Sequence, residues 1–498
     1  MLACICGMGG SLFEAWWTVL IPVSRDSSGV RLRQAALRAQ LGAILKRDFS
    51  VAEAAGLLMV SFALSAVLGS IQQFLFNAEF GAGAEASAFF AALRLRDVFY
   101  SMLAGRALSS AVIPVLARLA PSDGDEAQIR LLNLVLTALL VGLAVVVLTC
   151  QLAAPFIVTI VLAPGFDEAT KDLSVALIRI VLFQPLFVAV AYVGIAFLNS
   201  RHRFLLASLS LVCHNIGLIA GIEATRIEPA LGVTGPALGV ILGAALQILI
   251  LVPELRSSGM RWRPAWDPAD AHLRDVGRLL VAISCSACLP YVGLVLDTAF
   301  ASVAAEVAAL PAVYNAWLLV TLPQSMIGKA LGQSAFPRLA QSVAAGDWGR
   351  VRPLLYRTVG AAIALAMPAA VAFIAFGRAT IGVLFEHGRF DAPAAELTYR
   401  VLAVYAVAIP GTIATEILTR GLLAMRNTRM PLVADLGQVV GRAGLMVVLV
   451  PRLGVVAIPF AFATTSFVEA AVLACALFIG LRGTQSPIQR ESSLVLVE

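Results

Sequence analysis

The stretch LLNLVLTALLVGLAVVVLTCQLAAPFIVTIVLA, from Leu131 to Ala163, decides the fold class of this chain. It carries no charged side chain, and about 20 apolar residues are enough to cross the hydrocarbon core of a bilayer as a helix. A second apolar block runs from Leu173 to Leu198. Neither block shows the short alternating pattern of a transmembrane β-barrel strand, so we expect an all-α polytopic membrane protein.

Composition agrees with this fold class and excludes several kinds of function. Hydrophobic residues make up 60% of the 498 residues and charged residues 13%, whereas soluble domains carry about 25% charged residues. The sequence has no Walker motif, and Gly81-Ala-Gly83 follows a predicted membrane helix where a dinucleotide fingerprint would follow a strand. Cys285 and Cys288 form a CxxC, but no second Cys or His pair follows at metal-ligand spacing. The basic residues are spread over many short loops. We therefore predict no enzyme activity, catalytic residue, cofactor, metal site or nucleic-acid partner.

Polar breaks divide residues 51–483 into twelve predicted spans, which follow a hydrophobic and then basic extension at 1–50. The span centres lie near Leu64, Leu103, Val145, Val188, Ser210, Gly243, Cys288, Pro323, Met367, Tyr405, Gly441 and Phe467. Orientation follows from loop charge, because basic loops stay on the cytoplasmic side. If the first span enters from inside, the inner loops hold fifteen arginines and the outer loops hold four basic residues.

The chain also repeats itself. Three pairs of segments carry the repeat at offsets of 223, 224 and 226: Gly105–Leu116 with Gly328–Leu339, Phe166–Asp167 with Phe390–Asp391, and Arg203 with Arg429. Six spans per half is an even number, so both halves enter from the same side, and parallel halves around a cleft are typical of transporters. We predict two pseudo-symmetric six-helix lobes around a central cavity: an N-lobe at 51–255, a cytoplasmic linker at 256–270, a C-lobe at 271–483 and a tail at 484–498.

Eight segments resemble, in order, those of the MurJ (MviN) lipid II flippases, which belong to the multidrug/oligosaccharidyl-lipid/polysaccharide exporter superfamily. They are Phe80–Gly83, Ala88–Leu95, Ile113–Leu116, Ala163–Phe166, Leu198–Phe204, Leu384–Phe390, Asn427–Pro431 and Val450–Gly454. No single motif is highly specific, so the resemblance depends on their order and spacing. It runs from about residue 52 to residue 482, which is nearly the whole chain.

This resemblance implies a multi-pass protein of the bacterial cytoplasmic membrane that moves lipid II by alternating access. Lipid II is an undecaprenyl-diphosphate-linked peptidoglycan precursor. The resemblance implies a lipid-linked substrate, cell-wall synthesis proteins as partners and a monomeric state. Two other interpretations stay open: a flippase or exporter of another lipid-linked glycan or amphiphile, and an inactive relative that acts as a scaffold in envelope synthesis.

The sequence departs from the family where the substrate is held. The family's cavity arginines fall on Ala66, Gln72, Tyr100 or Ser101, and Leu318, and none of these is basic. Family members also commonly add two C-terminal helices that hold the lipid tail, whereas this sequence ends soon after the twelfth span. The family's usual diphosphate clamp is therefore absent from its usual positions.

Cations within spans are candidates for a relocated clamp, because an unpaired charge in a bilayer is costly and is usually functional. The second span carries Arg94, Arg96 and Arg106, and Lys329 is the repeat counterpart of Arg106. Arg94 and Arg96 are about 200° apart on a helix, so we expect one to face the cavity and the other to reach outward. Arg94, Arg106 and Lys329 can converge on a diphosphate, with Arg96 as a fourth candidate. The alternative is that they reach the lipid headgroups or pair structurally.

Asp297, in the seventh span, falls where some family members use an acidic residue to bind sodium together with polar groups of the eleventh and twelfth helices. Thr464 and Thr465 remain as partners, but the eleventh-helix positions fall on Arg442 and Met446. A guanidinium repels sodium, so we predict an Asp297–Arg442 ion pair in place of a cation site. The alternative is that each residue finds backbone or water partners.

A few more charged or polar residues lie within the predicted spans. Glu416 and Arg420 are one helical turn apart and are predicted to pair. Asp435 and Glu469 have no evident partner in the sequence. For His214 we favour a hydrogen bond between helices over a proton relay.

Overall fold

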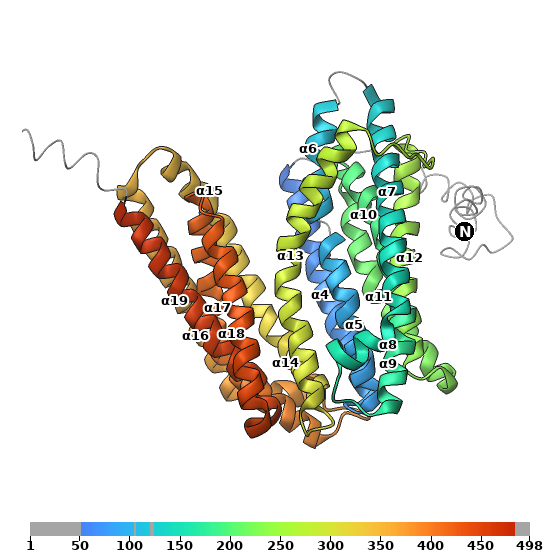
Figure 1. The fold of residues 1–498 in the computed structure, drawn as a ribbon, viewed down its shortest axis with the longest axis vertical. Helices are drawn as coiled ribbons and strands as arrows, with labels where there is room; N and C mark the ends of the chain where they lie inside the picture. The colour runs from blue at the N-terminus through green and yellow to red at the C-terminus, as the bar shows by residue number, and fades with distance from the viewer. Residues whose placement is uncertain (1–50, 104–105, 120–123, 484–498) are drawn as a thin grey trace, which may run out of the picture. The chain divides into compact units, whose positions relative to one another are not determined.

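The computed structural model describes residues 51–103, 106–119 and 124–483, and both the extension at 1–50 and the tail at 484–498 lie outside this range. The described residues form helices and no strand, which confirms the all-α class (Figure 1). In order, the elements are α4 (Val51–Phe80), α5 (Ala84–Leu103), α6 (Arg106–Leu119), α7 (Gly124–Leu152), α8 (Ala154–Phe156), η1 (Ile157–Leu162), α9 (Glu168–Val181), α10 (Gln184–Ser200), α11 (Leu205–Ile227), η2 (Pro229–Leu231), α12 (Thr234–Ser257), α13 (Ala271–Val303), α14 (Ala309–Pro323), η3 (Gln324–Lys329), α15 (Ala330–Ala344), α16 (Trp348–Leu384), α17 (Ala392–Ala424), α18 (Arg429–Leu453), η4 (Gly454–Val456) and α19 (Ala457–Gly483).

Eight stretches of the described chain are long and apolar enough to cross a membrane. Two of them join consecutive helices, because Glu168–Ser200 runs through α9 and α10, and Arg429–Leu481 runs through α18 and α19. Helix α5 is long enough, but four charged residues interrupt its apolar character. The chain is thus a multi-pass membrane protein, and the count of twelve spans stays a prediction.

The chain divides into two compact units whose boundaries differ from those of the predicted lobes. Unit 1 takes the described part of residues 1–72 together with 99–152 and 179–287. Unit 2 takes residues 73–98, 153–178 and 288–483 of the described chain. Unit 2 therefore combines two segments of the first sequence half with most of the second half.

Unit 1 has an apolar core built by α6, α7 and α10. Leu116, Leu132, Val193 and Phe197 are buried in it, and Leu251 of α12 joins them. These buried side chains come from helices that span the sequence from α6 to α12, so their apolar contacts hold distant parts of unit 1 together.

Helices α11 and α12 of unit 1 pack with their backbones in direct contact. Gly217 and Gly221 on α11 face Gly235, Gly239 and Gly243 on α12, with glycines spaced by four residues on each helix. A Cβ atom added at Gly217 would stand 2.1 Å from the backbone nitrogen of Gly243. Small residues at this spacing let two membrane helices approach closely, and here no side chain other than hydrogen fits.

In unit 2, α16, α17, α18 and α19 lie side by side (Figure 1). An apolar groove of about 650 Å³ runs between α16, α17 and α19, lined by residues such as Met367, Val407 and Phe478. Preceding them, α14, η3 and α15 follow one another without a break, and η3 is a π-helical segment that begins directly after Pro323.

Backbone contacts tie first-half segments into unit 2. The N–H of Arg389 donates to the carbonyl of Ala78 over 2.8 Å. Gly388 makes this approach possible, because its φ is +59° and a Cβ there would lie 2.3 Å from the same carbonyl oxygen. The N–H of Gly165 likewise donates to Ser302 Oγ over 3.1 Å.

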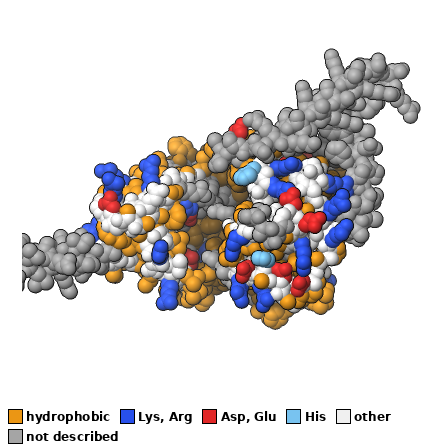
Figure 2. Space-filling view, turned by 90° about the horizontal axis from the view of Figure 1, so that it is seen from above, with side chains coloured by type: hydrophobic (Ala, Val, Ile, Leu, Met, Phe, Trp, Pro, Cys, Tyr) orange, Lys and Arg blue, Asp and Glu red, His pale blue; other side chains and the backbone are white. Residues whose placement is uncertain are grey.

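Exposed arginines lie near the helix ends and in the linker that the sequence places on the inner side. Arg118, Arg130, Arg261 and Arg274 are exposed in unit 1, and Arg350 is exposed in unit 2. Figure 2 shows Lys and Arg side chains spread over the end of the helices that it faces, with fewer Asp and Glu among them. The distribution is that of a helix end in contact with water, and the inner orientation stays a prediction.

Candidate functional site

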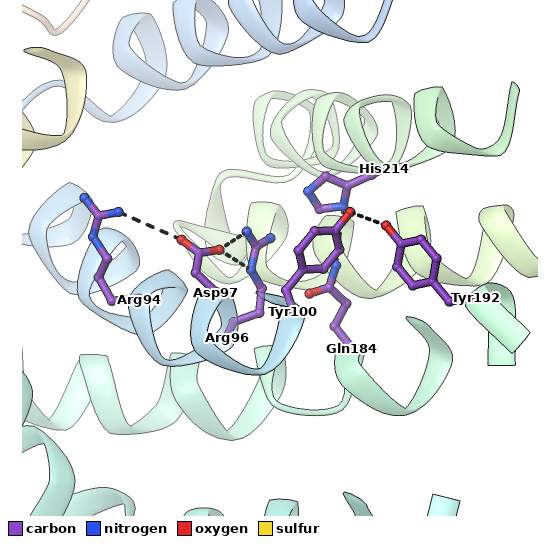
Figure 3. Close-up of polar contacts among 7 residues, drawn as sticks. All are labelled: Arg94, Arg96, Asp97, Tyr100, Gln184, Tyr192 and His214. Carbon is purple, nitrogen blue, oxygen red and sulfur yellow. Dashed lines mark hydrogen bonds and ion pairs between the residues drawn. The ribbon is translucent and has the colours of Figure 1, made fainter. Parts of the chain in front are cut away.

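Three charged residues lie within one turn of α5, and both arginines contact the same carboxylate (Figure 3). Arg96 Nε donates to Asp97 Oδ1 over 3.1 Å, and Arg94 Nη1 lies 3.9 Å from Asp97 Oδ2. Arg94 is 4% exposed and Arg96 is 9% exposed. The expectation that one of them reaches outward is therefore wrong. The flexible arginine side chains bend toward Asp97, which adjoins Arg96 and lies one turn from Arg94.

Arg94 is held on an aromatic surface. Its guanidinium carbon lies 4.7 Å from the ring centroid of Tyr314 on α14, and that ring stacks on Phe90 at 4.1 Å. Nε and Nη2 of Arg94 are buried and have no hydrogen-bond partner among the described residues. Two guanidinium groups contact one carboxylate here, and the open N–H donors of Arg94 suit an anion.

Asp297 of α13 and Arg442 of α18 form the predicted ion pair, and both are almost fully buried. Tyr405 of α17 donates its hydroxyl proton to Asp297 Oδ2 over 3.4 Å, and the Arg442 guanidinium carbon lies 4.6 Å from the Phe462 ring centroid. The pair is neutral overall, so it does not add to the positive charge around Arg94.

Thr464 and Thr465, the remaining candidate partners of Asp297, make hydrogen bonds to their own helix. Thr464 Oγ1 donates to the carbonyl of Phe460, and Thr465 Oγ1 donates to the carbonyl of Ala461, so both hydroxyls bond within α19. The guanidinium of Arg442 occupies the side of Asp297 that faces α18. This geometry favours a structural ion pair over a sodium site.

Arg106 and Lys329, the remaining candidate cations, begin α6 and end η3. Their side chains lie outside the described part of the structure. The structure therefore neither brings them to Arg94 nor separates them from it, and their role in a relocated anion site stays a prediction.

A polar cavity of about 510 Å³ lies within unit 2 between α13, α14, η3, α17, α18 and α19. Its polar lining consists of Thr321, Gln324, Ser325, Thr412, Thr415, Glu416, Asp435, Gln438, Arg442, Ser466 and Glu469. Arg420 pairs with Glu416 along α17, as predicted. Asp435 and Glu469, which had no evident partner in the sequence, pair with each other across α18 and α19.

A buried amide cluster in unit 2 was not predicted. Gln73 Nε2 and Asn77 Nδ2 of α4 both donate to Asn315 Oδ1 of α14, over 2.9 and 3.1 Å. All three residues are at most 3% exposed. Three amides inside apolar helices were the available signal, since such side chains need partners within a bilayer.

In unit 1 the polar side chains make contacts between helices. Tyr100 and Tyr192 share a hydrogen bond of 2.8 Å, and His214 Nδ1 lies 3.5 Å from Gln184 Nε2 (Figure 3). The neighbouring Asn215 donates to the backbone carbonyl of Ser65 over 2.9 Å. His214 thus joins two helices, as the sequence predicts.

The family model of the lipid II flippase MurJ matches residues 76–490, which include both halves of the repeat. The chain belongs to the MurJ lipid II flippase family. The match covers the buried arginines, the Asp297–Arg442 pair and the polar cavity, so all three are features of a MurJ-family member. It is a family of membrane transporters and not a family of enzymes.

Curated relatives of the MurJ family cover most of the chain. The probable lipid II flippase MurJ of Rhizobium meliloti (strain 1021) is 27% identical over 425 residues, which are 82% of this chain and 77% of the relative. The lipid II flippase MurJ of Burkholderia cenocepacia is 28% identical over 428 residues, which are 84% of this chain and 81% of the relative.

Solved structures of two branches of the superfamily share the fold. A lipid II flippase MurJ in an inward closed conformation matches with a TM-score of 0.73 and 17% identity, over 86% of this chain and 89% of that one. An inward-facing multidrug resistance transporter of the MATE family matches with a TM-score of 0.74 and 13% identity, over 86% of this chain and 99% of that one. At these identities the likeness concerns the fold alone.

Proposed function

We propose that this protein moves lipid II across the bacterial cytoplasmic membrane by alternating access. The observation that carries the proposal is the MurJ family match over residues 76–490. A flippase needs a place for a charged headgroup within the membrane and an apolar path for the hydrocarbon tail. Unit 2 offers buried cations and an apolar groove, and these are the features that such a substrate requires.

Arg94 is the residue that we expect to hold the substrate diphosphate. Its Nε and Nη2 groups are buried without partners, and Asp97 neutralises one of the two adjacent arginines. A guanidinium binds phosphate oxygens through two parallel hydrogen bonds, and its free donors gain most from such a ligand in a dry site. Arg96, Arg106 and Lys329 are proposed to complete the clamp.

A second candidate function is the movement of another lipid-linked glycan or amphiphile. The family's cavity arginines are replaced by Ala66, Gln72 and Leu318, and Arg442 occupies the family's cation position. An inactive relative that serves as a scaffold in envelope synthesis fits the same substitutions. We propose that the protein acts as a monomer beside cell-wall synthesis proteins.

Complementation tests the proposal. The wild-type chain is expressed in a bacterium depleted of its own lipid II flippase. Three variants are expressed separately in the same strain: Arg94→Ala, the double variant Arg106→Ala plus Lys329→Ala, and Arg130→Ala as a control. Arg130 is exposed and pairs with Asp267 at 3.7 Å, so its loss should leave growth unchanged. We expect the wild type to rescue growth and Arg94→Ala to fail at equal membrane abundance.

The outcomes separate the alternatives. A membrane-inserted wild type that gives no rescue contradicts lipid II transport and favours another substrate or a scaffold. Rescue by Arg94→Ala at the wild-type level leaves the transport function standing and removes the diphosphate role of Arg94. Movement of fluorescent lipid II in proteoliposomes, compared with another undecaprenyl-diphosphate-linked sugar, then assigns the substrate.

A further inference from the structure

The carboxyl groups of Asp435 on α18 and Glu469 on α19 lie within hydrogen-bonding reach of each other in the polar cavity. An ionised carboxylate only accepts hydrogen bonds, so this contact requires a proton on one of the two groups. Loss of that proton would place two negative charges side by side in a medium that screens them poorly. The geometry of the pair therefore favours one bound proton.

The charged groups that face this carboxyl pair already have partners of opposite charge. Glu469 is 9% exposed, and Asp435 is partly exposed, so the pair meets the cavity through Asp435. From α17 the pair faces Glu416, whose charge is balanced by Arg420. From α18 it faces Arg442, which is neutralised by Asp297 of α13. The cavity residues of α14 and η3, which include Trp317, Thr321 and Gln324, do not titrate.

Two hydroxyl groups of the cavity lack partners among the described residues. Ser466 Oγ lies on α19 one turn before Glu469, and its residue is 1% exposed. Thr415 Oγ1 on α17 is likewise buried without a hydrogen bond. Both residues line the same cavity as the carboxyl pair, and a water molecule there would find two hydroxyls and a carboxyl as partners.

We propose that Asp435 and Glu469 form a proton-binding site, and that its proton is exchanged with water during the transport cycle. In this step the shared O–H bond breaks, the proton passes to a water molecule in the cavity as hydronium, and both carboxylates remain. The reverse step restores the hydrogen bond. A proton fits this pair better than a metal cation does, because the hydrogen bond between the two carboxyl groups requires a proton.

Labelling with dicyclohexylcarbodiimide tests the first part of the proposal without substrate. This reagent adds the O–H of a protonated carboxyl group across its C=N bond, and no group leaves. The full chain in lipid nanodiscs is treated over a series of pH values, and the modified residue is identified by peptide mass spectrometry. Glu416→Gln is the matched control, because Glu416 lines the cavity but has its own cationic partner.

We expect label on Glu469 or Asp435, falling by about tenfold per pH unit once the pair ionises. Glu469→Gln and Asp435→Asn together should remove it, whereas Glu416→Gln should leave it unchanged and Asp297 should stay unlabelled. Wild-type protein without label at any pH overturns the proposal, as does label that persists in the double variant. Protection by sodium chloride relative to choline chloride also overturns it, because sodium would then occupy the site.

The exchange part rests on the proposed function, and a transport assay tests it separately. Movement of lipid II is followed in proteoliposomes with and without an imposed pH gradient. We expect the gradient to change the wild-type rate at least twofold and to leave the rate of Glu469→Gln unchanged. Labelled protein that moves no lipid II overturns the proposed function and keeps the proton site. Lipid II movement that ignores both the gradient and Glu469→Gln overturns proton exchange and keeps the proposed function.

Discussion

Helices α11 and α12 in unit 1 and helices α18 and α19 in unit 2 occupy corresponding places in the two halves of the repeat, but their contact surfaces differ. Each pair turns through a short 3₁₀ segment at a glycine of positive φ, Gly232 at +49° and Gly454 at +61°. Between α11 and α12 the backbones touch at glycines. Between α18 and α19 the facing side chains include Asp435 and Glu469.

This difference shows how one duplicated helix hairpin can serve two purposes. Backbones in contact exclude both water and ligand, so the α11–α12 pair supports the fold. The α18 and α19 surfaces keep long polar side chains, which hold a cavity open beside α13 and α17. A site within a membrane needs such a hollow, because charged groups there require partners or water. The predictions below test this contrast, from the largest expected effect to the smallest.

Gly217→Leu should abolish the folded protein or destabilise it by more than about 3 kcal/mol, beyond the usual cost of an overpacked core. The added Cβ would meet backbone atoms of Gly243, which have no rotamer to change. Thermal unfolding in detergent and membrane abundance measure the effect. Gly444→Leu on α18 is the control, because a Cβ there meets nothing within 4 Å. Equal stability of the two variants would contradict the structural role of the α11–α12 contact.

Asp297→Asn and Arg442→Met should each lower the free energy of unfolding by about 3–5 kcal/mol, because each leaves an unpaired charge in the interior. The double variant should recover most of this loss, because both charges are then gone. A double-mutant cycle by denaturation measures the coupling between the two residues. Additive losses in the double variant would show that the pair does not form.

Tyr405→Phe should lower the free energy of unfolding by about 0.5–1.5 kcal/mol, the typical net contribution of one hydrogen bond. The hydroxyl of Tyr405 donates to Asp297 Oδ2, and the ring itself stays buried without it. Tyr356→Phe is the control on the same unit, because Tyr356 is 59% exposed. A loss as large as that of Asp297→Asn would mean that the hydroxyl positions the whole ion pair.

Glu416→Gln should change stability by about 0.3–0.5 kcal/mol, as for other pairs spaced by one turn on a helix. Glu416 is 41% exposed on its side chain, so solvent weakens its attraction to Arg420. Chemical denaturation measures the free energy of unfolding of Glu416→Gln and of Asp297→Asn, and both residues belong to unit 2. A loss above 1 kcal/mol, the upper limit for exposed pairs, would place the Glu416 charge in a drier environment.

Residue types and spacing were enough to predict part of this arrangement. The apolar blocks predicted the helical membrane fold. Arg442 falls where some family members place a sodium-binding residue, and this predicted its pairing with Asp297. The spacing of Glu416 and Arg420 predicted their contact. Each of these inferences needs only helical periodicity or the chemistry of two opposite charges.

Contacts that depend on side-chain direction or on helix rotation could not be predicted from the sequence. Helical angles placed Arg94 and Arg96 on different faces, but the flexible side chains both turn to Asp97. The pairing of Asp435 with Glu469 requires knowing which faces of α18 and α19 meet. One signal was present, since Asp435, Gln438 and Arg442 repeat at helical spacing on a single face of α18.

The π-helical segment η3 between α14 and α15 has a mechanical consequence. A π turn contains one residue more than the α-helical turns around it, and such segments occur mostly as single turns at functional sites. A return of η3 to α-helical bonding would rotate α15 by about 100° about its axis relative to α14. A change in backbone bonding over six residues would thereby redirect every side chain of α15 without breaking the helical backbone.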